Sequence, residues 1–404
     1  MKIVLSGGGT LGPVIPLLAV RDVVIKKFPS AQFVWVGTKI GPEREIVEKA
    51  GMPFFVIGAG KWRRYMSLWN IIDIIKLLLA FVQAFWFLII EKPNLVISAG
   101  GFVSVPLHTA AWFLGVPAWV HQQDVRVGFA NRLMFPGAKK ITTALKQTTE
   151  FIGGKKVEWI GNPCRESILQ CAASLSFRPS LAASGGLAMP QQAISPIDKR
   201  DFSTALRSAR NDNGECGATN TSRQKFNIPA DAPIIFVLGG GTGSANLNKL
   251  LLEALQEIPT NWHIIHLVGK DRPKELALYA AGVFSNYHVF EFFTDEMKDA
   301  YALADVVVAR AGFGTLTELA ALSKAAIILP MYGSHQEDNA RFFAERDGII
   351  LMPQAMSTGI KLAIMLKDLM ENPAERAALG TNLHSLLPTA RPEKIIEIVE
   401  SLLK

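Results

Sequence analysis

Cysteine and histidine are scarce, because the 404 residues include only three cysteines and seven histidines. Cys164, Cys171 and Cys216 lack the paired spacing of a zinc site, and so few cysteines do not make a disulfide framework. The sequence therefore predicts neither a metal site nor a disulfide-stabilised fold. Four histidines share no ligand spacing, and we interpret them as structural: His108, His263, His266 and His288.

Other signatures of common enzyme classes are also missing. Ser6, Ser98 and Ser104 all lie outside the Gly-x-Ser-x-Gly context of a hydrolase nucleophile. Residues 3–12 resemble the strand and glycine loop that bind dinucleotides, but the second strand ends in residues 37–39 (GTK), without the acidic residue that would hold a ribose. These absences argue against a hydrolase triad and against a nicotinamide or flavin enzyme.

Acidic residues are few in the first part of the chain. Residues 1–165 carry 20 Lys and Arg against 9 Asp and Glu, whereas the remainder carries 22 against 26. This asymmetry suggests a polyanionic partner, and nucleic acid, an anionic membrane and a phosphorylated substrate are the candidates. Aromatic and basic residues are not interleaved as in single-strand binders, so nucleic acid is the least favoured.

The composition is that of a globular protein, with 49% hydrophobic and 19% charged residues over a length that allows two domains. Residues 1–6 (MKIVLS) lead straight into glycines, which is typical of a first strand and not of a signal peptide. A cytoplasmic protein is the default expectation.

Two sequence patterns each occur twice in the chain. Two strand-like runs end in similar glycine loops, at residues 3–12 and at residues 234–243. A second pattern, in which a strand and a glycine loop precede an apolar helix, a strand and a polar loop, occurs at residues 95–124 and again at residues 305–339. The repetition predicts two similar α/β halves.

Residues 309–322 (ARAGFGTLTELAAL) carry the strongest functional signal. Gly312 and Gly314 lie where the strand at 305–308 meets a helix, so that free N–H groups and the helix dipole would face an anion such as a phosphate. Glu318, about one turn further on, could accept hydrogen bonds from a ribose diol. A nucleoside diphosphate satisfies both requirements, although an ordinary βα turn with a dipole-compensating glutamate has the same pattern.

Residues 69–90 are apolar except for four polar residues that fall on one narrow helical stripe. The length approaches the ~20 residues that span a bilayer, but two charges within it argue against spanning. Such a helix either packs deep in its domain or lays one side on a membrane. Arg63 and Arg64, just upstream, could meet lipid phosphates.

The domain organisation follows from changes in composition. We expect an N-terminal Rossmann-like domain over residues 1–162, with a hinge at Gly161 and Pro163. Residues 172–223 lack sustained periodicity and are predicted to form a disordered insertion. A second Rossmann-like domain is expected over residues 224–390, and the amphipathic helix at 391–404 could pack back across the hinge.

Several motifs together resemble the MurG family of glycosyltransferases, and the resemblance spans nearly the whole chain apart from the insertion. In the second half these motifs are residues 293–297 (FTDEM), 301–305 (YALAD), 310–318 (RAGFGTLTE), and His335 and Gln336 with Asn339 and Ala340. In the first half they are residues 8–10 (GGT), 60–65 (GKWRRY), 98–104 (SAGGFVS), 121–124 (HQQD) and 161–165 (GNPCR).

The resemblance implies the GT-B architecture, with two Rossmann-like domains and a cleft between them. It implies inverting transfer of N-acetylglucosamine from UDP-N-acetylglucosamine to the 4-hydroxyl of the muramyl sugar in undecaprenyl-pyrophosphate-linked muramyl-pentapeptide, lipid I, which gives lipid II. No metal or other cofactor is implied. The enzyme would be peripheral on the cytoplasmic face of the cell membrane, and the membrane or acceptor residues would be Arg63, Arg64, Trp69, Phe85 and Trp86.

By the same resemblance, the donor site would lie in the second half. Phe293 and the backbone of Thr294 would hold uracil, Glu318 the ribose, and Gly314 with Thr315 the diphosphate. The remaining donor residues would be Ser244 near the diphosphate, Arg165 against leaving-group charge, His335 and Gln336 at the sugar hydroxyls, and Thr10 and Gly12 in the first loop.

The acceptor side departs from the family pattern. Family members usually read Gly-Gly-Thr-Gly-Gly-His in the first loop, whereas here Pro13 takes the histidine position. A family His-Glu-Gln-Asn becomes residues 121–124 (HQQD), which moves the carboxylate by two places. Asp124 is therefore our candidate for the catalytic base, and His121 is the second candidate. The altered loops also permit a related transferase with another lipid or small acceptor, or a UDP-sugar-binding protein without catalysis.

Overall fold

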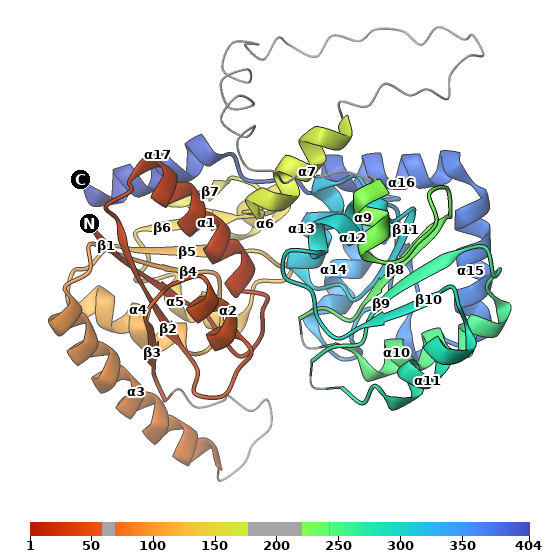
Figure 1. Cartoon of the computed structure of the whole chain (residues 1–404). Helices are drawn as coiled ribbons and strands as arrows, with labels where there is room; N and C mark the ends of the chain where they lie inside the picture. The colour runs from red at the N-terminus through yellow and green to blue at the C-terminus, as the bar shows by residue number, and fades with distance from the viewer. Residues whose placement is uncertain (59–68, 177–219, 242, 271) are drawn as a thin grey trace, which may run out of the picture.

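Two parallel β-sheets flanked by helices form the molecule (Figure 1). The computed structural model describes residues 1–58, 69–176, 220–241, 243–270 and 272–404. The elements of the first half are β1 (Lys2–Ser6), α1 (Val14–Lys27), β2 (Gln32–Gly37), α2 (Glu43–Lys49), β3 (Phe54–Val56), α3 (Trp69–Glu91), β4 (Leu95–Ser98), α4 (Ser104–Phe113), β5 (Ala118–Gln122), α5 (Phe129–Met134), β6 (Lys140–Thr143), α6 (Lys146–Ile152) and β7 (Val157–Trp159).

The second half starts after α7 (Glu166–Ser176) and α9 (Asn220–Lys225). Its strands are β8 (Ile234–Leu238), β9 (His263–Leu267), β10 (Tyr287–Phe290), β11 (Val306–Ala309), β12 (Ala326–Ile328) and β13 (Ile350–Leu351). Its helices are α10 (Ala245–Ala254), η2 (Leu255–Glu257), α11 (Glu275–Val283), α12 (Met297–Leu303), α13 (Phe313–Ala321), α14 (His335–Ala344), η3 (Gln354–Met356), α15 (Gly359–Glu371) and α16 (Pro373–Leu386), and α17 (Pro392–Leu403) follows.

Both sheets have the same topology. The first runs β3-β2-β1-β4-β5-β6-β7 and the second β10-β9-β8-β11-β12-β13, with every neighbouring pair parallel. Central strands such as β4 (LVIS) and β8 (IIFVL) are buried throughout, as expected for parallel strands covered on both faces. The predicted α/β fold with two Rossmann-like units is confirmed.

The strand order fixes where a ligand can bind. In each sheet the order reverses between the first strand and its later neighbour, which are β1 and β4 in one sheet and β8 and β11 in the other. Ligands of doubly wound sheets bind at such switch points, outside the carboxyl ends of the strands. The glycine loops that follow these strands therefore lie at the two expected binding positions.

The chain crosses between the two halves twice on one side of the molecule, where α7 and α17 lie in Figure 1. The backbone N–H of Asn162 donates to Pro388 O at 3.0 Å, and the N–H of Ala390 donates to Asn162 O at 2.9 Å. Beyond this crossing, α17 packs on α1 in the first half and buries Ile395, Ile398, Val399 and Leu402 in its core. Because these four residues recur at helical spacing, they form a single apolar stripe.

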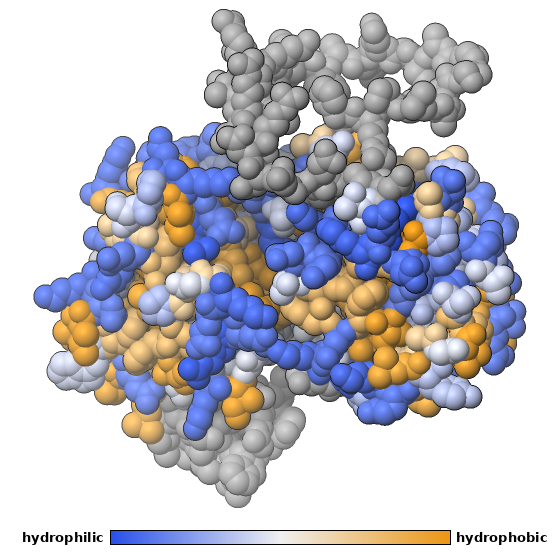
Figure 2. All heavy atoms as spheres, viewed as in Figure 1, coloured by the Kyte–Doolittle hydropathy of each residue, from blue (hydrophilic) through white to orange (hydrophobic). Residues whose placement is uncertain are grey.

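Helix α3 exposes an apolar face. Leu78, Leu79, Val82, Trp86 and Ile90 are each at least half exposed, and they fall on one side of the helix. Figure 2 shows some apolar side chains among hydrophilic ones at the lower left of the first half, where part of α3 lies in Figure 1. None of the described helices combines the length and the apolar content that crossing a membrane takes.

Candidate active site

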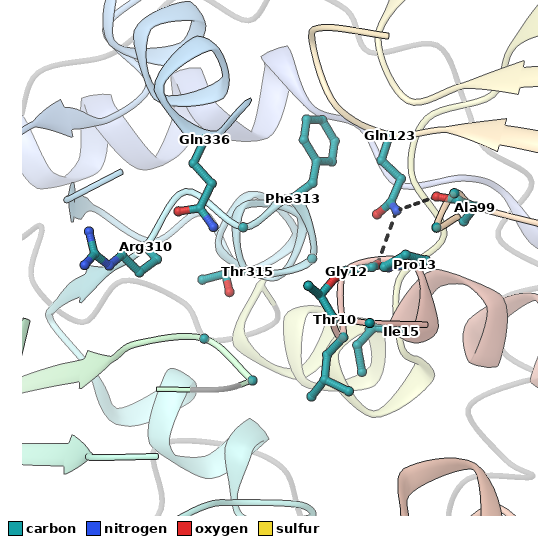
Figure 3. Close-up of a pocket in the computed structure, with 18 of the residues that line it drawn as sticks. Thr10, Gly12, Pro13, Ile15, Ala99, Gln123, Arg310, Phe313, Thr315 and Gln336 are labelled. Carbon is teal, nitrogen blue, oxygen red and sulfur yellow. Dashed lines mark hydrogen bonds between the residues drawn. The ribbon is translucent and has the colours of Figure 1, made fainter. Parts of the chain in front are cut away.

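A cavity of about 2010 Å³ lies between the two halves and is lined by loops from both switch points. Figure 3 shows Thr10, Gly12 and Gln123 of the first half facing Arg310 and Thr315 of the second. The following residues with a predicted role in the donor site line the cavity: Thr10, Gly12, Arg165, Ser244, Phe293, Thr294, Gly314, Thr315, Glu318, His335 and Gln336. One continuous space is thus lined by residues that are far apart in the sequence, such as Thr10 and Gln336, which are 326 positions apart.

The N-terminus of α13 opens into this cavity. Gly312 is the N-cap residue and provides no side chain to cap the helix, while Gly314 and Thr315 in the first turn line the cavity. The first N–H groups of a helix have no partner within the helix and lie at the positive end of its dipole. This end of α13 is therefore suited to a phosphate.

Arg310 lies in the same part of the cavity and was not singled out in the sequence analysis. Its Nε donates to Ser244 Oγ at 2.9 Å, and its Nη1 donates to Leu329 O at 3.1 Å, Pro330 O at 2.9 Å and Gln354 Oε1 at 2.7 Å. Burial and the neighbouring charge of Arg272 lower the pKa of Arg310. The signal that could have revealed it is the single cation in the motif at residues 309–322.

Ser244 has two structural contacts. Its hydroxyl caps α10 by accepting the N–H of Leu247 at 3.2 Å, and it also accepts from Arg310. The side chain thus joins the glycine loop after β8 to the guanidinium at the end of β11. Both contacts hold the loop residues beside the N-terminus of α13.

Glu318 is nearly buried and forms an ion pair with Arg165. The Arg165 Nε donates at 2.7 Å and its Nη2 approaches to 2.5 Å, and both contacts are to Glu318 Oε1. The adjacent Tyr301 also lines the cavity, and burial together with the charge of Glu318 raises the pKa of its hydroxyl. Arg165 therefore orients the carboxylate that we predicted as the ribose acceptor.

Phe293 and Thr294 line the side of the cavity near β10. The Phe293 ring is almost fully buried, with centroids 5.4 Å from Phe226 and 4.9 Å from Phe290. The backbone N–H of Thr294 donates to Glu296 Oε2 at 3.3 Å. Because the Phe293 ring packs into the core, the main chain is the part of Phe293 that remains for a ligand.

The N-terminal end of α14 contributes His335 and Gln336. The helix is capped by Ser334 Oγ, which accepts the N–H of Gln336 at 3.3 Å. The Gln336 side-chain oxygen accepts the N–H of Met331 at 3.1 Å, so its orientation is fixed at the cavity wall. His335 is half exposed.

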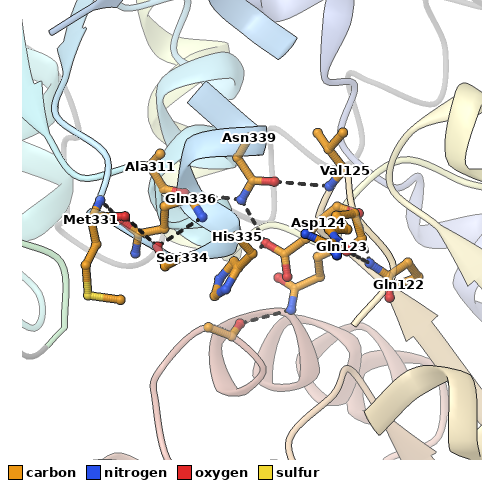
Figure 4. A network of polar contacts seen from close by, with 12 residues as sticks. Gln122, Gln123, Asp124, Val125, Ala311, Met331, Ser334, His335, Gln336 and Asn339 are labelled. Atoms are coloured by element: carbon orange, nitrogen blue, oxygen red, sulfur yellow. Dashed lines mark hydrogen bonds and ion pairs between the residues drawn. The ribbon is translucent and has the colours of Figure 1, made fainter. Parts of the chain in front are cut away.

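Asp124 follows β5 at the opposite wall, and Figure 4 shows the polar network around it. Its Oδ1 accepts a hydrogen bond from Asn339 Nδ2 at 2.8 Å and lies 3.8 Å from His335 Nε2. The Asp124 carbonyl accepts from Gln122 Nε2 at 2.8 Å. The carboxylate therefore lies where the two halves of the molecule meet.

His121 lies elsewhere, which corrects its candidacy as a base. Its Nδ1 is 2.8 Å from Thr142 Oγ1 and its Nε2 is 2.8 Å from Asn162 Oδ1, and it is not among the residues that line the cavity. Burial lowers the pKa of His121 to about 4. Asn162 in turn donates to Thr317 Oγ1 of α13 at 2.7 Å. His121 thus anchors the hinge, and both of its ring nitrogens are occupied.

The first glycine loop is held by contacts that its sequence did not reveal. Gln123 Nε2 donates to Gly12 O at 3.2 Å, and the carboxylate of the buried Glu43 accepts the N–H of Gly9 at 3.3 Å. Leu11 extends across the cleft, because a Cβ added to Gly241 would lie 2.2 Å from Leu11 Cδ1. Glycine at position 241 therefore leaves room for Leu11.

The predicted membrane residues have different positions. Arg63 and Arg64 lie outside the described residues, and Trp69 is the first residue of α3. Phe85 is partly buried and packs on Phe81 with a centroid distance of 6.0 Å. Trp86 is 58% exposed and lies on the apolar face of α3.

Comparison with known proteins places these features in a family. Residues 3–143 match the glycosyltransferase family 28 N-terminal domain, and residues 234–387 match the glycosyltransferase family 28 C-terminal domain. A UDP-N-acetylglucosamine–N-acetylmuramyl-(pentapeptide) pyrophosphoryl-undecaprenol N-acetylglucosamine transferase of Treponema denticola is 32% identical over 366 residues, covering 85% of this chain and 82% of the relative. The Clostridium kluyveri protein of the same name is 31% identical, covering 82% and 79%.

Solved structures show the same architecture. The crystal structure of Acinetobacter baumannii MurG matches with a TM-score of 0.67 at 22% identity and covers 99% of both chains. A UDP-GlcNAc 2-epimerase of Neisseria meningitidis, solved with UDP-GlcNAc bound, matches with a TM-score of 0.62 at 14% identity, covering 99% of this chain and 100% of the other. At these identities the two structures bear on the fold alone.

Proposed function

Because this chain belongs to the MurG family of glycosyltransferases, we propose that it transfers N-acetylglucosamine from UDP-N-acetylglucosamine to the muramyl sugar of lipid I. The product is lipid II, a peptidoglycan precursor. The observation that carries the proposal is the pairing, in one cavity, of the uncapped N-terminus of α13 with the Glu318 carboxylate on the same helix. These two features match the diphosphate and the ribose of a UDP donor.

The donor would lie along the second half. Uracil would contact the main chain of Phe293 and Thr294, and the ribose would reach Glu318, which Arg165 holds in place. Among the described residues, no cluster of three or more histidine, cysteine, aspartate or glutamate side chains is placed to hold a metal ion. The diphosphate charge would meet the α13 N–H groups at Gly314 and Thr315, with Arg310 nearby.

The transfer itself is a single displacement with inversion. The acceptor 4-hydroxyl oxygen forms a bond to the anomeric carbon while the bond from that carbon to the diphosphate oxygen breaks. Asp124 takes the hydroxyl proton, and UDP leaves with the electron pair of the broken bond. His335 and Gln336 would orient the sugar between these groups.

A lipid-linked acceptor would bring the enzyme to a membrane, and we propose that the apolar face of α3 contacts that surface. Leu78, Val82 and Trp86 would enter the lipid interface, as the apolar side of an interfacial helix does. The excess of basic residues in positions 1–165 favours an anionic surface. Peripheral attachment to the cytoplasmic face of the cell membrane follows from this proposal, with residues 1–162 as the acceptor and membrane domain and 224–390 as the donor domain.

The test is release of UDP from UDP-N-acetylglucosamine with and without a short-chain lipid I analogue, comparing the wild type with Asp124→Asn. We expect acceptor-dependent release by the wild type and a decrease of roughly 10²- to 10⁴-fold in the variant, the range of a general base. Glu400→Gln, an exposed change on α17, is the matched control and should retain wild-type activity. Donor binding without acceptor-dependent release by the wild type would contradict the assignment of lipid I.

A further inference from the structure

Asn339 is a fully buried side chain of α14 that contacts the first half of the molecule. Its Nδ2 donates to Asp124 Oδ1 at 2.8 Å and to Ala311 O at 3.3 Å, while its Oδ1 accepts the N–H of Val125 at 3.0 Å. We propose that Asn339 is a positioning residue, and this proposal rests on the proposed function. Asn339 orients the Asp124 carboxylate for proton transfer, and it does so only while the cleft is closed.

The orientation of the Asn339 amide is determined by its partners. The Ala311 carbonyl can only accept a hydrogen bond, and the Val125 N–H can only donate one. The amide therefore fits in one orientation, with its nitrogen toward Asp124 and Ala311 and its oxygen toward Val125. An ionised carboxylate at Asp124 is the partner that this orientation suits, because it accepts hydrogen bonds and donates none.

The contact leaves one carboxylate oxygen available. Both Asn339 Nδ2 and His335 Nε2, which are one helical turn apart on α14, approach Oδ1 of Asp124. Among the described residues, none forms a hydrogen bond or an ion pair with Oδ2. The Asp124 side chain is 29% exposed and lines the cavity. Oδ2 is therefore the oxygen that can receive the acceptor proton.

The same contact depends on the relative position of the two halves. Asp124 and Val125 follow β5 of the first sheet, whereas Asn339 lies between β12 and β13 of the second. Two further ion pairs cross between the halves, Lys270 with Glu45 and Arg126 with Asp338, the second at 3.9 Å. Opening the cleft would break the Asn339 bonds to Asp124 and Val125 together. Closure would thus complete the catalytic arrangement, as it does in enzymes with mobile domains.

The experiment measures kcat and KM for UDP release with the short-chain lipid I analogue in Asn339→Ala, Asn339→Asp and Asp124→Asn, and in Asn339→Ala combined with Asp124→Asn. We expect Asn339→Ala to lower kcat by about 10- to 100-fold with a smaller change in the donor KM, because loss of alignment at the reacting atoms slows chemistry. The double variant should be no slower than Asp124→Asn alone, because the two residues act as one unit. Glu345→Ala, an exposed change at the end of α14, is the control and should match the wild type.

The comparison of kcat with KM separates positioning from a general structural role. Loss of alignment at Asp124 lowers kcat, whereas general damage to the site would also weaken donor binding and raise the donor KM. Asn339→Asp keeps the side-chain size and an acceptor for Val125 but opposes two carboxylates, and it should lose at least as much kcat. Asn339→Asp replaces Asn339→Ala as the test variant if Asn339→Ala has a lower melting temperature than the wild type.

The possible outcomes distinguish the two levels of the proposal. If the wild type shows no acceptor-dependent release, the proposed function fails, and the role of Asn339 fails with it. If the wild type is active and Asn339→Asp retains its kcat, only the role of Asn339 is overturned. The same holds if the losses in the double variant are additive, because additivity means that the two side chains act independently.

Discussion

The interaction of Glu318 with a ribose diol can be tested by changing the protein and the ligand together. In Glu318→Gln the carboxylate becomes a neutral amide of nearly the same shape. Two nitrogen atoms of Arg165 already contact Oε1 of Glu318. The two hydroxyls of a bound ribose would therefore compete with Arg165 for Oε1 and share Oε2. We therefore count one charge-assisted hydrogen bond as lost, which is worth about 1.5–3 kcal/mol. This corresponds to roughly 10- to 150-fold weaker binding of UDP.

Isothermal titration of the wild type and Glu318→Gln with UDP and with 2′,3′-dideoxy-UDP checks this value. The variant should lose affinity for UDP. It should bind the dideoxy analogue with the same affinity as the wild type, because that analogue has no ribose hydroxyls to donate hydrogen bonds to Glu318. Equal losses for both ligands would mean that the substitution damages the site as a whole. Unchanged UDP affinity would refute the assignment of Glu318 to the ribose.

Three further predictions concern other parts of the molecule. Trp86→Glu should reduce sedimentation with vesicles containing anionic lipid while leaving UDP affinity unchanged, because Trp86 lies on the exposed apolar face of α3. Gly241→Ala should weaken UDP binding by forcing Leu11 out of its place in the cleft, at a cost of about 1–3 kcal/mol, and Leu11→Ala should restore it in the double variant. The pKa of the buried His108 is lowered to about 3, so this group remains neutral when folded and takes up a proton on unfolding below its ordinary pKa of 6.5. The contribution of the neutral His108 to the free energy of unfolding is therefore lost as the pH falls from 6.5 toward 3, by about 2 kcal/mol at pH 5. In urea unfolding, His108→Leu should lose less stability between pH 7 and pH 5 than the wild type does.

The sequence was most informative where function depends on local backbone geometry. The glycine loops and the motif around Glu318 indicate strand-to-helix turns, and parallel topology then puts such turns at the carboxyl edge of each sheet. Arg310 was overlooked because its role depends on carbonyls from Leu329 and Pro330, which belong to a neighbouring strand and loop.

Local sequence patterns could not predict the contacts between the two halves of the molecule. His121 and Asp124 are three residues apart in one motif, yet the first points into the hinge and the second into the cavity. Successive residues of a strand alternate between its faces, but the loop after β5 changes direction, so spacing alone could not assign them. The partnership of Asp124 with Asn339 depends on how the two domains are placed, which no sequence period encodes.

The return of α17 to the first half has a consequence for synthesis of the protein. Domains generally fold in order as they emerge from the ribosome. Here the first sheet is complete once β7 has been made, but the core around α1 does not receive Ile395, Ile398 and Leu402 until residues 392–403 emerge. The nascent first half must therefore keep an apolar strip exposed to water, and available to chaperones, while some 230 further residues, from 160 to 391, are translated.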